Sequence, residues 1–210
     1  MNLPTKITFS RIIAAIIMIV ILFILSLVNF NSPAILGGKV DLVFFIIFIF
    51  FLAAAYTDHL DGSIARKRNM ISDLGKFLDP VADKLLVNSM VIFLVAPSIF
   101  SKYNTVQTVN FSVWCAIILV ARDIVVDSLR FIAAQKGQII AANKYGKLKT
   151  VAEMVAICLV LLNGWPFSYF DANWPVGLHM TDLFIYFATI CSVFSGIIYL
   201  IQNKHVFKSK

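Results

Sequence analysis

The amino-acid sequence predicts an all-α integral membrane protein, with six transmembrane helices in a single domain that covers residues 1–210. Hydrophobic residues make up 60% of the chain and charged residues only 14%, whereas a soluble domain is usually about 45–50% apolar and about 25% charged. The apolar residues also form long continuous runs. Because a membrane-spanning β-barrel has alternating polar and apolar residues, these runs indicate helices.

Six apolar stretches support this prediction. A spanning helix needs about 20 residues, or about 17 when its ends reach into the interface, so the shorter stretches span only if their polar flanks belong to the same helices. The first stretch exceeds the roughly 7–15 apolar residues of a secretory signal, and we interpret it as a retained helix. The stretches are Ile12–Phe30, Val40–Tyr56, Leu85–Phe100, Val109–Ile132, Val151–Trp165 and Leu183–Ile201.

The basic residues predict the orientation. Of the 18 Lys and Arg residues, all but Lys39 and Lys102 lie at the two termini or at the second-to-third and fourth-to-fifth connections. The positive-inside rule therefore places both termini and these connections in the cytoplasm, for a multi-pass protein of the cell membrane in contact with its lipids. The rule also accounts for the net charge of +7 without a nucleic-acid partner. A homodimer is left open.

Four aspartates lie on the predicted cytoplasmic side. Asp58 and Asp61 follow the second apolar stretch, and Asp79 and Asp83 precede the third. Spacings of three and four residues place each pair on one face of a helix. Four carboxylates so close together would take up protons unless a cation lies between them. Carboxylate oxygens suit Mg²⁺, Mn²⁺ or Ca²⁺ rather than zinc, and two such ions together are typical of phosphoryl displacement.

A structural interpretation of the same acids pairs them with nearby basic residues. We favour the metal site because four acids at such fixed spacing rarely arise by chance. Gly62 and Ala65, one turn apart beside the acids, leave the helix surface bare, which serves helix packing or admits a flat ligand such as a nucleotide base or ribose. The basic residues are Arg66, Lys67, Arg68, Lys76 and Lys84.

These residues resemble the complete motif of the CDP-alcohol phosphatidyltransferases. The resemblance implies a six-helix fold with a cytoplasm-facing site that holds two divalent cations, Mg²⁺ or Mn²⁺. It also implies transfer of a phosphatidyl or similar group from a CDP-activated donor to an alcohol, with release of CMP. In this sequence the motif, residues 58–83, reads Asp58-x-x-Asp61-Gly62-x-x-Ala65-Arg66-(x8)-Gly75-x-x-x-Asp79-x-x-x-Asp83.

The resemblance also implies a role for each motif position. All four aspartates would be metal ligands, and Asp83 would in addition be the base for the acceptor hydroxyl. The CDP donor would be bound by Asp61, Gly62, Ala65, Arg66 and Gly75.

Two further segments resemble phosphatidylglycerophosphate synthases, one branch of that family. They imply CDP-diacylglycerol and glycerol 3-phosphate as substrates, with phosphatidylglycerophosphate and CMP as products. Residues 1–10 could also form a short amphipathic lead-in on the membrane surface, with Arg11 as a candidate contact of the donor phosphates. The segments are Asn2-Leu3-Pro4-x-x-x-Thr8-x-x-Arg11 and Arg122-Asp123…Arg130…Gly137…Gly146-Lys147-x-Lys149-Thr150.

The acceptor phosphate is a dianion that needs fixed cations. Arg122 and Arg130 lie in the predicted fourth helix and Lys147 opens the fifth, and we favour these three as its ligands because arginine in an apolar helix is otherwise costly. The alternatives are contact with lipid headgroups, or pairing of the two arginines with Asp123 and Asp127.

Two other functions are weighed. The first is the same chemistry with another acceptor, namely inositol phosphate, serine or phosphatidylglycerol. The second is a divalent-cation transporter, which we disfavour because transporters usually bind their ions near the bilayer midplane, between related halves of the chain. Here the acids lie at helix ends and no repeat is visible.

Overall fold

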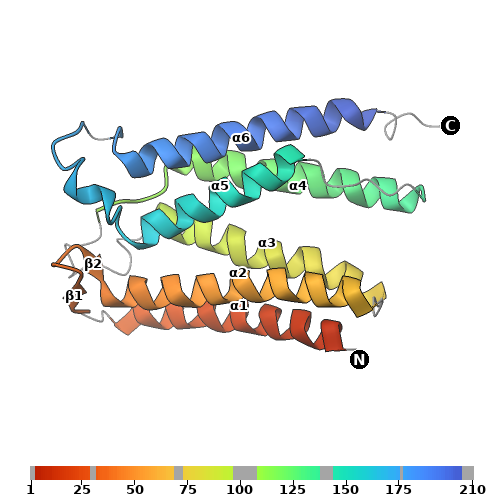
Figure 1. Cartoon of the computed structure of the whole chain (residues 1–210), viewed down its shortest axis with the longest axis horizontal. Coiled ribbons are helices and arrows are strands. Elements are labelled where there is room, and N and C mark those ends of the chain that lie inside the picture. Colours follow the sequence, from red (N-terminus) through yellow and green to blue (C-terminus); the bar gives the residue numbers. More distant parts are fainter. Residues whose placement is uncertain are drawn as a thin grey trace. The chain divides into compact units, whose positions relative to one another are not determined.

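The computed structural model of the protein describes residues 3–28, 32–68, 73–96, 108–137, 144–175 and 177–204. This part of the chain is mostly helical, with six α-helices, one short 3-10 helix and a two-stranded hairpin (Figure 1). The expectation of a helical chain is confirmed. The elements are α1 Leu3–Val28, β1 Ala34–Ile35, β2 Val40–Asp41, α2 Leu42–Arg68, α3 Asp73–Val95, α4 Val113–Gln135, α5 Lys144–Leu161, η2 Phe167–Tyr169 and α6 Met180–Gln202.

Several helices are longer than the apolar stretches that predict them. The α2 helix has 27 residues and continues past its apolar stretch to Arg68. The 23-residue α3 begins at Asp73, before its apolar stretch, and the 18-residue α5 begins at Lys144. The polar flanks of these stretches therefore belong to the helices, as spanning would require.

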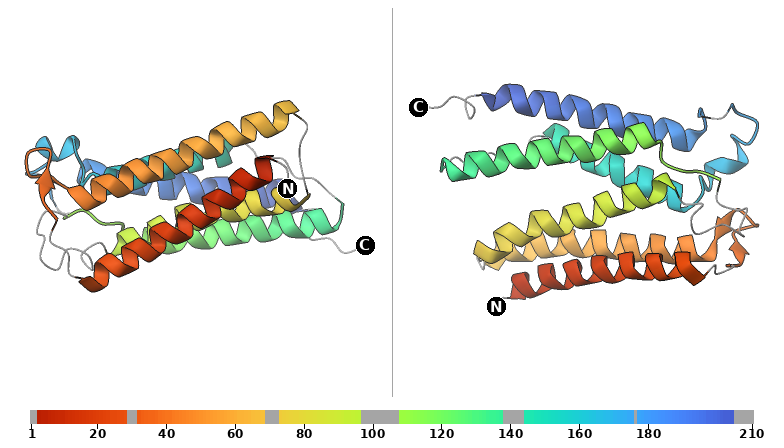
Figure 2. Two further views of the ribbon diagram at one scale, coloured as in Figure 1. Left: turned by 90° about the horizontal axis from the view of Figure 1, so that it is seen from below. Right: turned by 180° about the vertical axis from the view of Figure 1, so that it is seen from behind.

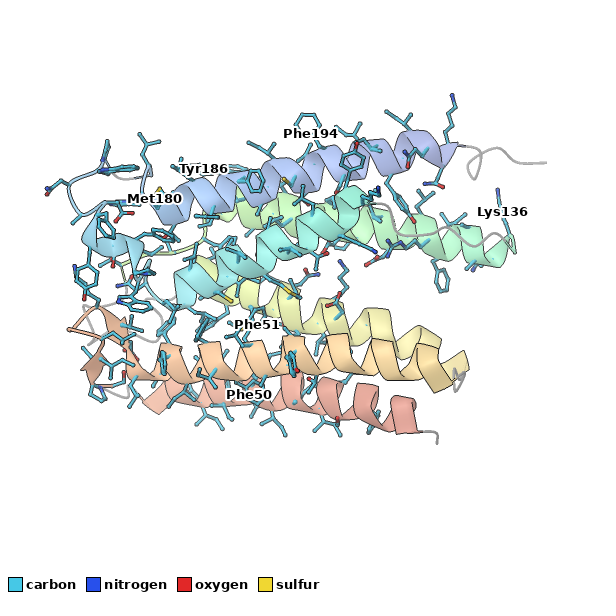
Figure 3. The ribbon with its side chains drawn as sticks, viewed as in Figure 1. Phe50, Phe51, Lys136, Met180, Tyr186 and Phe194 are labelled. Carbon is cyan, nitrogen blue, oxygen red and sulfur yellow. The ribbon has the colours of Figure 1, made fainter. Side chains whose placement is uncertain are left out.

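Length and composition identify one helix of the described chain, α6, as long and apolar enough to cross a membrane. Two shorter apolar helical segments, Ile12–Ile24 and Leu42–Thr57, lie in α1 and α2. Large apolar side chains are also exposed along the helices, including Phe50 and Phe194, which are labelled in Figure 3. Exposed apolar surface of this extent is typical of a chain in contact with lipid.

The chain forms two compact units. The first comprises residues 1–110 with Leu161–Trp165 and contains α1, α2, α3 and the hairpin. Within it, α1 packs against both α2 and α3 (Figure 2). The rings of Phe44 and Phe93 stack with centroids 5.9 Å apart and join α2 to α3. Its buried side chains include Ala15, Met18, Leu22, Phe44, Phe51, Met90 and Leu94.

The hairpin precedes α2 in the first unit. Its strands are antiparallel, with Ala34 opposite Asp41, and the turn has positive φ values at Leu36, Gly37 and Gly38, of which the two glycines adopt them without strain. The Asp41 carboxylate accepts a hydrogen bond from the backbone N–H of Val43 at 2.7 Å, which caps the start of α2.

The second unit comprises Phe111–Val160 with residues 166–210, and contains α4, α5, η2 and α6. The α4 and α6 helices pack side by side. Val126, Leu129 and Ala133 of α4 form a buried cluster with Tyr199 of α6. The buried face of α6 is made of small and polar residues together with this tyrosine, which lets its backbone approach α4 closely.

Candidate active site

The four predicted metal ligands lie at one end of the first unit. Asp58 and Asp61 are in the last part of α2, and Asp79 and Asp83 are in the first three turns of α3. Residues 69–72 join the two helices, whose connected ends lie toward the same end of the first unit (Figures 1 and 2). The helix positions are those that the sequence predicts.

The donors at these positions are all carboxylate oxygens, which fit hard divalent cations such as Mg²⁺ and Mn²⁺. Asp83 is half-buried. The side chains of residues 58–80, and that of Arg11, lie outside the described part of the structure. The roles expected of these residues therefore stay predictions, and they concern Arg11, Asp58, Asp61, Gly62, Ala65, Arg66, Gly75 and Asp79.

Four charged side chains meet inside the second unit. The Lys149 ammonium lies 2.8 Å from Asp123 Oδ1 and 2.6 Å from Glu153 Oε2. Arg122 Nη1 donates to Asp123 Oδ1 at 3.0 Å. The side chains of Asp123, Lys149 and Glu153 are each only 1% exposed. We call Arg122, Asp123, Lys149 and Glu153 the charge cluster; its two positive and two negative charges balance.

Buried charges are tolerated when they are paired, and in the cluster Lys149 has a structural role as the partner of two buried carboxylates. Both carboxylates that it contacts hold it within the interior, whereas Lys147, two residues earlier, is exposed. The pairing of Arg122 with Asp123, which the sequence left open, is present. Glu153 was missed, although its position four residues after a lysine within an apolar helix was a usable signal.

The guanidinium of Arg122 is also held by α6. Its Nη2 donates to Ser195 Oγ at 2.7 Å, and the arginine side chain is 13% exposed. A Cβ atom at Gly196 would lie 3.1 Å from Arg122 Cγ, so the glycine leaves room for the arginine stem. Among the described residues, Arg122 Nε has no hydrogen-bond partner.

Arg130, two turns further along α4, has a different environment. Its Nε donates to Tyr199 Oη at 3.0 Å, and its Cζ lies 5.4 Å from the centre of the tyrosine ring. The contact with Asp127 is long, at 3.9 Å, and the Arg130 side chain is 42% exposed. Its charge therefore faces outward while one edge of the guanidinium is fixed against a buried ring. Ser195 and Tyr199 were missed, because nothing in the local sequence links them to arginines about 70 residues away.

Chemically, the second unit presents cations that suit an anionic ligand. Arg130 and Lys147 are exposed, whereas the Arg122 side chain is 13% exposed and its Nε–H, which has no partner in the described chain, is buried. Guanidinium groups bind phosphate through paired N–H donors, and lysine binds it as a point charge.

The family and the individual proteins that this chain resembles agree with one another. Residues 1–202 match the family described as CDP-alcohol phosphatidyltransferase. A protein of Bacillus subtilis named CDP-diacylglycerol–glycerol-3-phosphate 3-phosphatidyltransferase is 33% identical over 208 residues, which cover 99% of this chain and 98% of that protein. Proteins with the same name from Mycoplasma pneumoniae and Rickettsia bellii are 37% identical over 172 residues and 32% identical over 210 residues. They cover 80% and 98% of this chain, and 70% and 97% of their own lengths.

Proposed function

This chain belongs to the CDP-alcohol phosphatidyltransferase family, and from that premise we propose that it transfers a phosphatidyl group from CDP-diacylglycerol to glycerol 3-phosphate. The products are phosphatidylglycerophosphate and CMP. One observation carries the choice of acceptor: relatives named for this reaction align with the chain over 98% or more of its length.

The proposed metal site explains why the four acids lie at the ends of two connected helices. Two divalent cations, Mg²⁺ or Mn²⁺, held by Asp58, Asp61, Asp79 and Asp83, would offset the charge of the pyrophosphate and of the departing CMP. The number of cations, and which aspartates bind each cation, are inferred from the motif.

Asp83 is the proposed base. Its carboxylate takes the proton of the acceptor hydroxyl while that oxygen forms a bond to the phosphorus of the phosphatidyl group. The bond from this phosphorus to the bridging oxygen breaks, and CMP leaves with the bonding electrons. A base that is held in line needs no unusual basicity, so an ordinary half-buried carboxylate on α3 suffices.

The donor nucleotide is proposed to lie against the bare surface of α2. Gly62 and Ala65 give the nucleotide access to the backbone, and Arg66 supplies a positive charge next to it. Asp61 and Gly75 complete the donor site. Arg11 of α1 is a further candidate contact for the donor phosphates.

The acceptor phosphate is proposed to bind Arg122, Arg130 and Lys147. The exposure of Arg130 and Lys147 supports this, because a dianion arriving from water must reach them. Arg122, held by Asp123 and Ser195, adds a fixed positive charge on the same helix as Arg130.

The family is membrane-associated, and we further propose that all six helices span the bilayer with both termini and the active site in the cytoplasm. The distribution of Lys and Arg supports this orientation. Both substrates then meet the acids from the same side, the donor from the lipid and the acceptor from water.

The test is an assay of the purified protein in detergent with CDP-diacylglycerol, Mg²⁺ or Mn²⁺, and a panel of labelled alcohols. We expect CMP release and a labelled lipid with glycerol 3-phosphate. Product formed only with inositol phosphate, serine or phosphatidylglycerol would contradict the acceptor assignment. Absence of CMP release with every acceptor would contradict the proposed enzyme activity itself.

A further inference from the structure

Two buried side chains of α6 contact the two arginines of α4 that are proposed to bind the acceptor. Ser195 Oγ accepts a hydrogen bond from Arg122 Nη2 at 2.7 Å, and Tyr199 Oη accepts one from Arg130 Nε at 3.0 Å. Ser195 and Tyr199 are four residues apart and therefore lie on one face of α6. This is the face that packs against α4.

Tyr199 determines which edge of Arg130 is available. Its ring is 2% exposed and is packed against Val126, Leu129 and Ala133, so its hydroxyl has a fixed position. Because Nε is bound to this hydroxyl, the terminal nitrogens are the ones left for a ligand, with Nη1 3.9 Å from Asp127 Oδ1. A mobile exposed arginine loses side-chain entropy when it binds a ligand, and an arginine fixed beforehand loses less.

Ser195 has the complementary effect on Arg122. Its hydroxyl holds Nη2 while Asp123 holds Nη1 at 3.0 Å. Lys149 in turn fixes the Asp123 carboxylate through both of its oxygens, at 2.8 and 2.9 Å. Both terminal nitrogens are therefore held, and Nε is buried next to Gly196, so Ser195 helps to fix the position of the Arg122 charge.

We propose that Ser195 and Tyr199 are positioning residues, which orient Arg122 and Arg130 for the acceptor phosphate without touching the acceptor themselves. This rests on the proposed function, because it concerns the same two arginines. It gives α6 a part in acceptor selection, although α6 carries none of the motif residues.

The test compares Ser195→Ala and Tyr199→Phe with two matched controls on the same helix. Ser192→Ala removes another fully buried serine hydroxyl, one that has no hydrogen-bond partner among the described residues. Tyr186→Phe removes a hydroxyl from a tyrosine that is 38% exposed. Each variant is assayed for KM of glycerol 3-phosphate, KM of CDP-diacylglycerol, kcat and thermal stability.

We expect Ser195→Ala and Tyr199→Phe to raise the KM of glycerol 3-phosphate by about fivefold each, which corresponds to the net contribution of one ordinary hydrogen bond. The KM of CDP-diacylglycerol and kcat should stay within about twofold of wild type, and both controls should behave like wild type. Titration calorimetry with glycerol 3-phosphate alone should show the same loss of affinity.

Double variants separate positioning from packing. If Tyr199 acts through Arg130, Tyr199→Phe adds no further increase in acceptor KM when Arg130 is already alanine. Additive effects, an unchanged acceptor KM in both single variants, or an equal increase in Ser192→Ala would each overturn the proposal. Failure of the wild-type protein to use glycerol 3-phosphate would overturn the proposed function instead. The same variants would then be measured with the acceptor that is used.

Discussion

Replacement of Lys149 by methionine tests the charge cluster most directly. The lysine contacts Asp123 at 2.8 Å and Glu153 at 2.6 Å. At an effective dielectric constant of about 20, each contact corresponds to roughly 6 kcal/mol of attraction before the cost of burial. Loss of one partner from a buried ion pair costs about 3–5 kcal/mol. We expect Lys149→Met to lower stability by that amount, because both Asp123 and Glu153 would lose the ammonium group that they contact.

The cysteines of the chain provide an assay for this loss. Cys115, Cys158 and Cys191 are all free, and they lie in α4, α5 and α6 respectively. A thiol-reactive dye therefore labels the second unit as it unfolds on heating. For a chain of this length the expected fall in Tm is roughly 10 °C.

Two further variants make the prediction specific. Lys147→Met, on the exposed side of the same helix, should leave Tm within about 2 °C of wild type, since exposed charges contribute little to stability. It should instead raise the KM of glycerol 3-phosphate. In Lys149→Met with Glu153→Gln, the remaining Arg122–Asp123 pair is again neutral, and most of the lost stability should return. An unchanged Tm in Lys149→Met, or no recovery in the double variant, would refute the charge-balance reasoning.

The remaining predictions concern the active site. Asp61→Asn and Asp83→Asn should each abolish CMP release while the protein still inserts in the membrane. The control Asp73→Asn, on α3 but at no defining position of the motif, should remain active. Near-normal turnover in Asp61→Asn or Asp83→Asn would exclude the role assigned to that residue. Arg130→Ala should raise the KM of glycerol 3-phosphate about tenfold with the donor KM unchanged, whereas an unchanged acceptor KM would favour contact with lipid headgroups. Chelation with EDTA should stop CMP release, and Mg²⁺ or Mn²⁺ should restore it; activity that survives chelation would contradict the metal site.

Local sequence patterns predicted the helices and the helix positions of the acids. Helix formation and the position of an acid along a helix both depend on residues that are close together in the sequence. Helix ends were less predictable, as α5 illustrates: its apolar stretch starts at Val151, but the helix begins at Lys144. Hydropathy marks where apolar residues are continuous, whereas a helix continues through a charged residue such as Lys149 when a partner elsewhere satisfies the charge.

The partners of the arginines on α6 could not be predicted, for a physical reason. Ser195 and Tyr199 are ordinary helix residues whose importance arises only when α6 lies against α4. The pairing depends on the rotation of each helix about its axis, which a single sequence does not specify. Gly196 illustrates the same limit: its missing side chain matters because the stem of Arg122 passes 3.1 Å from where a Cβ atom would be.

The balance of the charge cluster also exists within each helix separately. On α4, Arg122 is beside Asp123, and on α5, Lys149 pairs with Glu153 one turn later. With α4 and α5 spanning the bilayer as proposed, each helix would enter the lipid with these charges already paired, which lowers the cost of insertion before the helices meet. The bond between Lys149 and Asp123 forms only when α4 and α5 associate. It then favours one relative rotation of the two helices, since any other would lose the contact between Lys149 and Asp123.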